Sequence, residues 1–334
     1  MPENIDILEN DLLEKYPGVL DILLKDHTTN RNIFWATDNY QEIGEDYQFN
    51  SPILPSLITG ENGQIIMPRV KKNKSLQQLR AREMAEVFTP SWICNSQNNL
   101  IDNDWFGREN VFNQEVTSSD GTRNWVVNPN KIEFPKDKTW KQYVRETRLE
   151  MACGEAPYIT SRYDTTTGEF IPVKKRIGLL DRKLRVINEN VDDSGKWLEA
   201  AQSAFKNIFA FEWQGDSLLL AREALLITFI ENFVEKFGKE PLLKSIQFIA
   251  YIISWNTWQM DGMKGVIPNS CTSKQKEIYS LFDGVQISYE PCEGCLTNNI
   301  KKHNGIYCII KDWSNKDKDS GNKGRKLKFI DLIK

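Results

Sequence analysis

The stretch from residue 149 to 158 constrains the fold of this chain more than any other. Residues 149 to 152 are typical of the end of a buried strand, and Cys153 and Gly154 open a loop of small residues. Such a loop lets a ligand approach the backbone closely, and the Glu150 carboxylate can hydrogen-bond a cationic or hydroxyl-bearing part of it. A tight strand-to-helix turn without a ligand explains the same residues equally well.

Helical and strand-like segments alternate along the chain. Apolar residues at helical spacing predict a helix over 217–237, and the almost wholly apolar run 244–255 predicts a second. The runs 305–310 and 328–333 have the length of strands. Strands interleaved with helices predict an α/β fold.

Composition limits the classes of protein that fit. The formal net charge is -3, so contacts with nucleic acid would need local basic patches. The stretch 69–82 is basic, and we interpret it as a solvated helix face more readily than as a phosphate-binding patch. The apolar run 246–255 is too short to cross a membrane, and the N-terminus does not resemble a secretory signal. The 6 cysteines are too few for a disulfide framework, so we expect a cytoplasmic protein.

The loop after residue 149 resembles the first cofactor motif of the N6-adenine DNA methyltransferases, the modification subunits of restriction–modification systems. That motif runs D/E-P-A-C-G-x-G-x-F/L. The matching positions are Glu150, Ala152, Cys153 and Gly154, with Tyr158 at the aromatic or apolar position. Met151 and Ala156 replace the Pro and the second Gly of the motif.

A second, upstream segment resembles the same family. Glu86 and Val87 are followed by Phe88, Thr89 and Pro90, as in the loop that these enzymes close over the methionine part of the cofactor. The resemblance implies a Rossmann-like S-adenosylmethionine-dependent methyltransferase fold with a mostly parallel sheet. It covers residues 86–334, and residues 1–85 are an N-terminal extension of unknown role. The implied substrate is adenine in duplex DNA, which has to rotate out of the base stack to be methylated.

The resemblance also implies acidic residues that bind the ribose and the adenine of the cofactor, in one of two registers. We favour Asp261, after the strand-like segment 256–261, with Asp312 as its partner. The other register uses Asp181 and Asp216, and a turn or a helix cap explains any one of these residues.

The family's catalytic motif, D/N-P-P-F/Y/W, is absent from the sequence. In the favoured register, the final run 327–333 is the strand that should lead into this motif. We therefore leave the catalytic residues unknown, and expect a chain that needs a partner subunit or a relative kept for binding.

The C-terminal half also predicts a metal site, in an insertion at about residues 265–305. A C-x2-C pair can place two thiolates on one zinc ion, and a third cysteine and a histidine complete a tetrahedral site. The predicted ligands are Cys271, Cys292, Cys295 and His303, with Cys308 in reserve because it lies in a strand-like apolar run.

Two other classes of function fit less well. Asp164, Asp181 and Lys183 match the short acid…D/E-x-K pattern of metal-dependent nucleases, which is common by chance. The last class is a non-catalytic subunit of the same fold that binds DNA or a partner.

Overall fold

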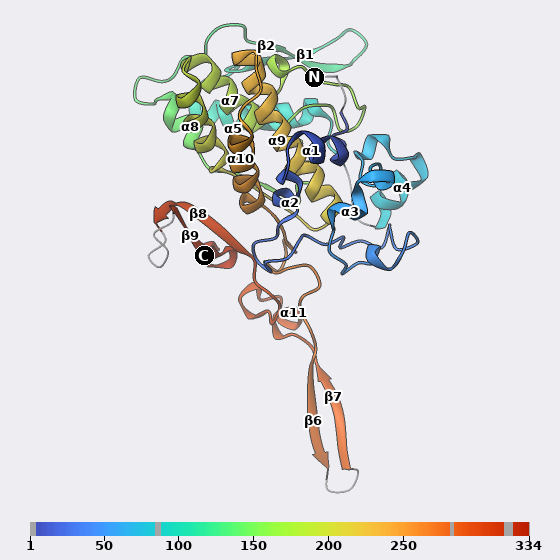
Figure 1. Cartoon of the computed structure of the whole chain (residues 1–334). Helices are drawn as coiled ribbons and strands as arrows, with labels where there is room; N and C mark the ends of the chain where they lie inside the picture. Colours follow the sequence, from blue (N-terminus) through green and yellow to red (C-terminus); the bar gives the residue numbers. More distant parts are fainter. Residues whose placement is uncertain (1–4, 84–87, 281–283, 317–322, 334) are drawn as a thin grey trace.

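The chain is a mixed α/β protein of helices and small sheets (Figure 1). The computed structural model describes residues 5–83, 88–280, 284–316 and 323–333. The α-helices are α1 Glu9–Lys15, α2 Val19–Leu24, α3 Pro55–Ile58, α4 Lys74–Glu83, α5 Ser91–Phe106, α6 Trp140–Arg145, α7 Leu179–Asn190, α8 Ser194–Phe205, α9 Gly215–Phe237, α10 Leu243–Asn256 and α11 Glu293–Thr297. The strands are β1 Asn113–Thr117, β2 Arg123–Val127, β3 Arg148–Met151, β4 Ile208–Glu212, β5 Thr257–Gln259, β6 Lys274–Ser280, β7 Gly284–Glu290, β8 Ile309–Lys316 and β9 Lys323–Lys328.

One parallel sheet of three strands lies at the centre, in the order β3-β4-β5. Its register pairs Glu150 with Ala210 and Phe211 with Trp258. The other described strands form three antiparallel hairpins, β1-β2, β6-β7 and β8-β9. Of the mostly parallel sheet that we expected, the described residues therefore show three parallel strands.

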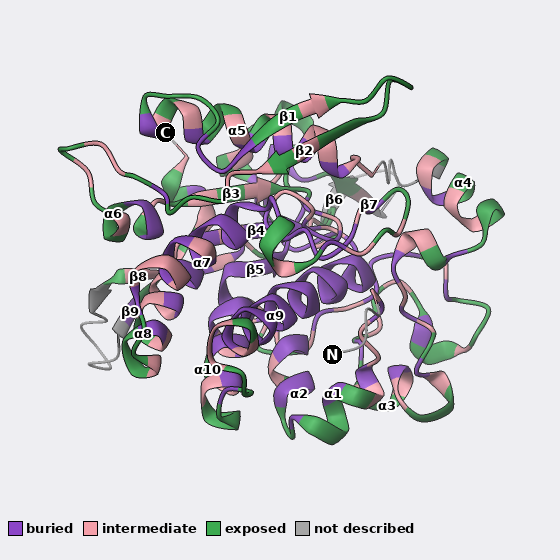
Figure 2. Cartoon of the chain, turned by 90° about the horizontal axis from the view of Figure 1, so that it is seen from above, coloured by how far each residue is buried: buried purple, intermediate pink, exposed green. Residues whose placement is uncertain are grey.

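Helix α9 forms the middle of the core. It is buried from Gly215 to Phe233, beside the buried strands β4 and β5 (Figure 2). It ends where Gly238 takes a left-handed conformation, with φ of 67°, which glycine adopts without strain. The predicted helices over 217–237 and 244–255 are confirmed as α9 and α10. None of the helices that the structure describes is long and apolar enough to cross a membrane.

The described part of the first 85 residues shares this core. Leu20 and Trp35 belong to the same cluster of buried residues as Leu226 of α9 and Ile253 of α10. Residues on both sides of the predicted boundary at 85 therefore pack together.

A buried ion cluster joins the N-terminal region to α9. The Asp216 carboxylate lies 2.9 Å from Arg80 Nη1 and 3.4 Å from Lys72 Nζ, and it accepts a 2.7 Å hydrogen bond from the Tyr40 hydroxyl. The expectation that residues 69–82 form a solvated face is wrong for Lys72 and Arg80, because both side chains are buried against this carboxylate.

The C-terminal quarter is built of hairpins. The β6-β7 hairpin projects from the body, with α11 near its base, and the β8-β9 hairpin lies below α10 (Figure 1). The prediction of a strand over 328–333 is wrong. Residues Phe329–Leu332 form a 3-10 helix after β9, and β9 pairs antiparallel with β8 rather than joining the parallel sheet.

Candidate functional site

A cavity of about 950 Å³ lies at the carboxyl ends of β3 and β4. Ligand sites of open parallel sheets occur in this position, outside the carboxyl ends of the strands. The cavity brings together residues that the sequence predicted from two distant segments: Phe88, Thr89, Glu150, Ala152, Cys153, Gly154 and Tyr158. Pro90 is not among its described lining residues and instead precedes the first residue of α5.

The loop after β3 has an unusual backbone. Ala152, Gly154 and Ala156 all have positive φ, at 50°, 53° and 58°. A Cβ added to Gly154 would meet the Phe88 ring at an ordinary 3.8 Å, so the dihedral angle rather than lack of space favours glycine there. The two alanines carry strain of order 1–2 kcal/mol each, of the kind that recurs at ligand sites.

Glu150 supports this loop from the strand below it. Its carboxylate accepts hydrogen bonds from the backbone N–H groups of Tyr158, at 3.5 Å, and Ile159, at 3.2 Å. Desolvation raises the pKa of Glu150 to about 8, although these hydrogen bonds act in the opposite direction. The charge of Glu212 adds to the increase.

Glu212, at the end of β4, is a second carboxylate in the same cavity. It accepts hydrogen bonds from the N–H groups of Gly154, at 2.8 Å, and of Trp213, at 2.9 Å. It therefore ties the loop after β3 to the end of the neighbouring strand. Burial raises the pKa of Glu212 as well, against the effect of these donors.

Our sequence reasoning missed Glu212. The signal that could have found it is the apolar run from 208 to 211, which ends in this acidic residue just before a helix that begins at Gly215.

The N-terminal region supplies another wall of the cavity. Ala36 and Phe49 line it, and the carbonyl of Ala36 accepts a 3.1 Å hydrogen bond from the Trp213 indole. The Gln259 side chain fixes this segment by accepting from Phe34 N–H, at 3.1 Å, and donating to the Phe34 carbonyl, at 2.8 Å. The Arg69 guanidinium lies 5.0 Å from the centre of the Phe88 ring. Glu86 and Val87 lie outside the described residues.

None of the four predicted aspartates is among the described residues that line this cavity. Asp261 follows β5 as expected, and its carboxylate holds a turn through Met263 N–H, at 3.0 Å, and Lys264 Nζ, at 3.2 Å. Asp312 lies in β8 and accepts from Ser314. Asp181 lies within α7 rather than after a strand, and Asp216 belongs to the buried ion cluster. Roles for Asp261 and Asp312 in cofactor binding stay predictions.

The residues of the nuclease pattern have structural partners. Asp164 accepts a 2.7 Å hydrogen bond from Ser91 N–H, and Asp181 accepts one of 2.8 Å from Ser161 N–H. Burial lowers the pKa of Lys183 to about 7, and its ammonium donates to the carbonyl of Glu146. Both carboxylates thus take part in local turns, although Oδ1 of Asp181 is buried without a hydrogen-bond partner among the described residues.

Four side chains near the base of the β6-β7 hairpin form a cluster that can hold a metal ion. The ligand atoms of Cys271, Cys292, Cys295 and His303 all lie within 4.8 Å of one another. His303 Nδ1 is 3.5 Å from the first of these sulfurs, 3.7 Å from the second and 3.6 Å from the third. The predicted ligand set is confirmed as a group that could bind a metal.

The local backbone explains how these ligands meet. Cys292 immediately precedes α11, so the C-x2-C spacing puts Cys295 in the first turn of that helix. A Cβ on Gly294 would lie 2.6 Å from His303 N, so only glycine permits this approach. Asn304 N–H donates to Cys292 Sγ at 3.2 Å, a contact that orients a thiolate ligand. The reserve ligand Cys308 is fully buried elsewhere, with its sulfur 3.4 Å from the Gln259 carbonyl oxygen.

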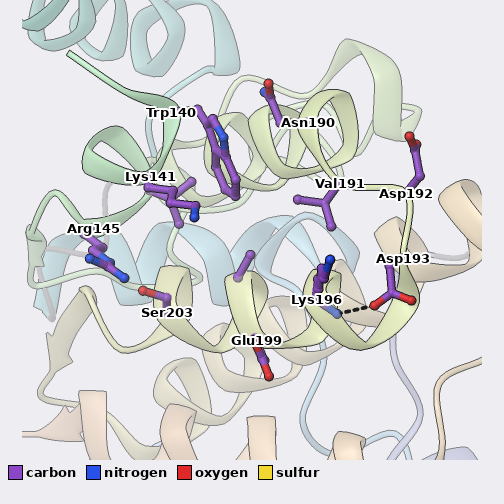
Figure 3. Close-up of a pocket in the computed structure, with 12 residues that line it drawn as sticks. Trp140, Lys141, Arg145, Asn190, Val191, Asp192, Asp193, Lys196, Glu199 and Ser203 are labelled. Atoms are coloured by element: carbon purple, nitrogen blue, oxygen red, sulfur yellow. Dashed lines mark hydrogen bonds between the residues drawn. The ribbon is translucent and has the colours of Figure 1, made fainter. Parts of the chain in front are cut away.

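A second hollow, of about 550 Å³, lies between α6 and α8 (Figure 3). Trp140 and Val191 lie toward its middle, while Arg145 and Asp193 lie on opposite sides of it. Asp193 caps α8 by accepting from Lys196 N–H at 2.9 Å. The charged groups that line this hollow do not converge on one point, so we assign no chemistry to the hollow.

Comparison with known proteins gave no match to any family model, any curated protein or any solved structure.

Proposed function

We propose that the chain binds S-adenosylmethionine in the cavity between Phe88 and Glu212 and belongs to an adenine-N6 DNA methyltransferase of a restriction–modification system. The observation that carries this proposal is the meeting of two carboxylates and a small-residue loop at the ends of two adjacent parallel strands. In this proposal β3-β4-β5 is part of a Rossmann-like sheet.

The chemistry of the cavity suits this ligand. S-adenosylmethionine carries cationic groups at its methionine end and hydroxyl groups on its ribose. Two carboxylates, Glu150 and Glu212, can accept hydrogen bonds from both kinds of group. The loop from 152 to 158 allows close approach, and Trp213 offers a half-buried ring for stacking.

Methyl transfer to adenine needs more than this cavity. Acceptors for the adenine amine and an aromatic ring that stacks on the flipped base are supplied in the family by D/N-P-P-F/Y/W, which this sequence lacks. We therefore propose that transfer requires another polypeptide. The metal cluster is proposed to hold zinc in a structural role, since three thiolates and one imidazole suit tetrahedral Zn²⁺.

Isothermal titration with S-adenosylmethionine tests the proposal. We expect binding by the whole chain, weakened by Glu150→Ala and by Glu212→Ala, because losing a charge-assisted hydrogen bond costs about 1.5–3 kcal/mol. Gly154→Val should weaken binding too, since valine is strained at this φ. Glu14→Ala, on the exposed surface of α1, is the matched control and should bind as the unaltered chain does.

No heat of binding with the unaltered, folded chain would refute the cofactor and the family together. Alternatively, S-adenosylmethionine binds while a reconstituted complex with DNA and the partner transfers no methyl group. That result would favour the alternative hypothesis, a non-catalytic subunit of the same fold that binds DNA or a partner.

A further inference from the structure

Strand β3 lies at the outer edge of the parallel sheet. It pairs with β4 and with no other segment that the structure describes. Arg148 donates its N–H toward β4, to the Asn207 carbonyl at 3.0 Å. Because the backbone groups of a strand alternate in direction, those of Leu149 and Met151 point to the open edge.

Two apolar side chains of this edge strand are exposed, and they alternate with Arg148 and Glu150. The relative exposure of Leu149 is 43% and that of Met151 is 70%, whereas β4 and β5 are almost wholly buried (Figure 2). Natural edge strands are usually protected by charges, proline or a covering segment. Parallel sheets are normally covered on both faces, so exposed aliphatic side chains on a parallel strand indicate a surface that another element covers.

The edge is continuous with the cofactor cavity. Leu149 and Met151 line the same cavity as Glu150 and Gly154, and Ile101 of α5, itself 41% exposed, lies on the same wall. Among the described residues, the sheet extends from β3 in one direction only. The ligand site of an open parallel sheet is usually found where strands extend to both sides.

We infer that a β-strand of another polypeptide binds parallel to β3 along this edge. A hydrogen-bonding edge of this kind is complementary to a strand rather than to a helix or a nucleic acid. A strand that runs parallel to β3 has its carboxyl end on the cavity side of the sheet, whereas an antiparallel strand would begin there. The residues that follow the parallel strand then lie beside the loop from 152 to 158, where an acceptor for the adenine amine is required. The inference rests on the proposed function and adds to it the docking surface and the kind of partner.

Site-specific photo-crosslinking in the native cells tests the partner directly. Benzoylphenylalanine replaces Met151 in one variant and Leu242 in the control, which is 78% exposed and lies just before α10. We expect one discrete adduct from position 151 that is absent from position 242. Mass spectrometry should place the crosslinked peptide in a strand just before an Asp/Asn-Pro-Pro-aromatic sequence of another protein.

An adduct between two copies of this chain, an adduct to a protein without that sequence, or no adduct specific to position 151 would overturn the inference. The purified pair then provides a quantitative check. Met151→Lys should weaken association by more than about tenfold, because it places a charge on the pairing edge, and Leu242→Lys should leave it unchanged. Equal association of both variants would also overturn it.

The two proposals fail in different experiments. Loss of the crosslink with S-adenosylmethionine binding intact removes the docking surface alone. Absence of cofactor binding by the chain removes the proposed function, whatever the crosslink shows.

Discussion

At the scale of single residues, the cavity depends on two carboxylates that meet from neighbouring strands. Glu150 was visible in the sequence because it stands between an apolar run and a loop of small residues. Glu212 was not, because its run is followed directly by a helix and has no glycine-rich loop to mark it. The buried pairing of Arg80 with Asp216 could not be predicted either, since ion pairs between residues so far apart in the sequence leave no local pattern.

The raised pKa of Glu150 should make the proposed binding of S-adenosylmethionine depend on pH. Below pH 8 the carboxyl of the free protein is largely protonated, since its pKa is about 8. A cationic ligand favours the charged form and lowers that pKa, so binding releases a proton. We expect affinity for S-adenosylmethionine to rise by about tenfold between pH 6.5 and 8 and then to level off.

The affinity of Glu150→Gln, measured over the same pH range, provides the control. It still includes any pH dependence that comes from protonation of the ligand itself. The unaltered chain should show the steeper dependence. Parallel curves for the two proteins would contradict a role for this proton.

At the scale of elements, the packing of α1 on α9 buries acidic side chains. Glu9 of α1 and Glu223 of α9 are 1% and 0% exposed, and neither oxygen of the Glu223 carboxyl has a hydrogen-bond partner among the described residues. Burial, followed by the charges of Glu9 and Asp6, raises the pKa of Glu223, and the positive charge of Arg162 only partly opposes this. Burial likewise raises the pKa of Glu9 above its usual value of 4.5.

The free energy of unfolding should therefore fall as pH rises above about 5. In that range the unfolded chain has released the Glu9 proton while the folded chain retains it, so the unfolded state binds fewer protons. Glu9→Gln mimics the protonated form. We expect it to increase the free energy of unfolding at pH 8 by on the order of 1–2 kcal/mol and to change it little at pH 5.5, measured by urea denaturation. A variant that is destabilised equally at both values would show that Glu9 remains charged in the folded chain.

The C-terminal elements show why the cluster of three cysteines and one histidine was predictable from the sequence. The C-x2-C pair and the nearby histidine lie close together in the sequence, in a spacing typical of zinc ligands. The structure brings these residues together with Cys271. The β6-β7 hairpin has little to stabilise it by itself, because an isolated two-stranded hairpin is marginally stable in water. Metal binding at its base can replace the missing core.

Elemental analysis of protein purified without chelator should find about one zinc ion per chain. Cys292→Ser and Cys271→Ser should each lose it, since three ligands hold zinc far more weakly. Cys308→Ala is the control and should retain the metal, because this thiol is buried away from the cluster. No zinc in the unaltered chain, or full zinc content in Cys292→Ser, would remove the site.

At the scale of the whole molecule, the α/β class and the two long apolar helices followed from the sequence. The division at residue 85 stays a prediction, and residues from both sides of it pack in one core. Hydrophobic patterning tells which face of an element is buried but not against which distant segment it packs. The prediction of a strand over 328–333 was wrong, because residues Phe329–Leu332 form a 3-10 helix after β9. A short apolar run does not distinguish these structures, nor does it show whether the preceding strand pairs in a hairpin or in the parallel sheet.

The chain as it stands should not methylate DNA. The sequence lacks the D/N-P-P-F/Y/W motif that positions acceptors for the adenine amine in the proposed family, so we expect no transfer of tritiated methyl groups to mixed-sequence DNA, even under conditions where S-adenosylmethionine binds. Addition of the strand-bearing partner should restore transfer. Robust incorporation by the chain alone, abolished by Glu150→Ala, would show that an unusual segment of this sequence holds the base.

The hydrogen bonds between Phe34 and Gln259, which are 225 positions apart, have a consequence for how the protein is made. During synthesis on the ribosome, the first eighty residues emerge long before the chain that will cover Trp35 and pair with Lys72 and Arg80. Contacts of such large sequence separation form late and slowly. The nascent N-terminal region thus exposes apolar side chains and unpaired charges for most of translation, which makes it a substrate for chaperones until the segment carrying α9 and β5 has emerged.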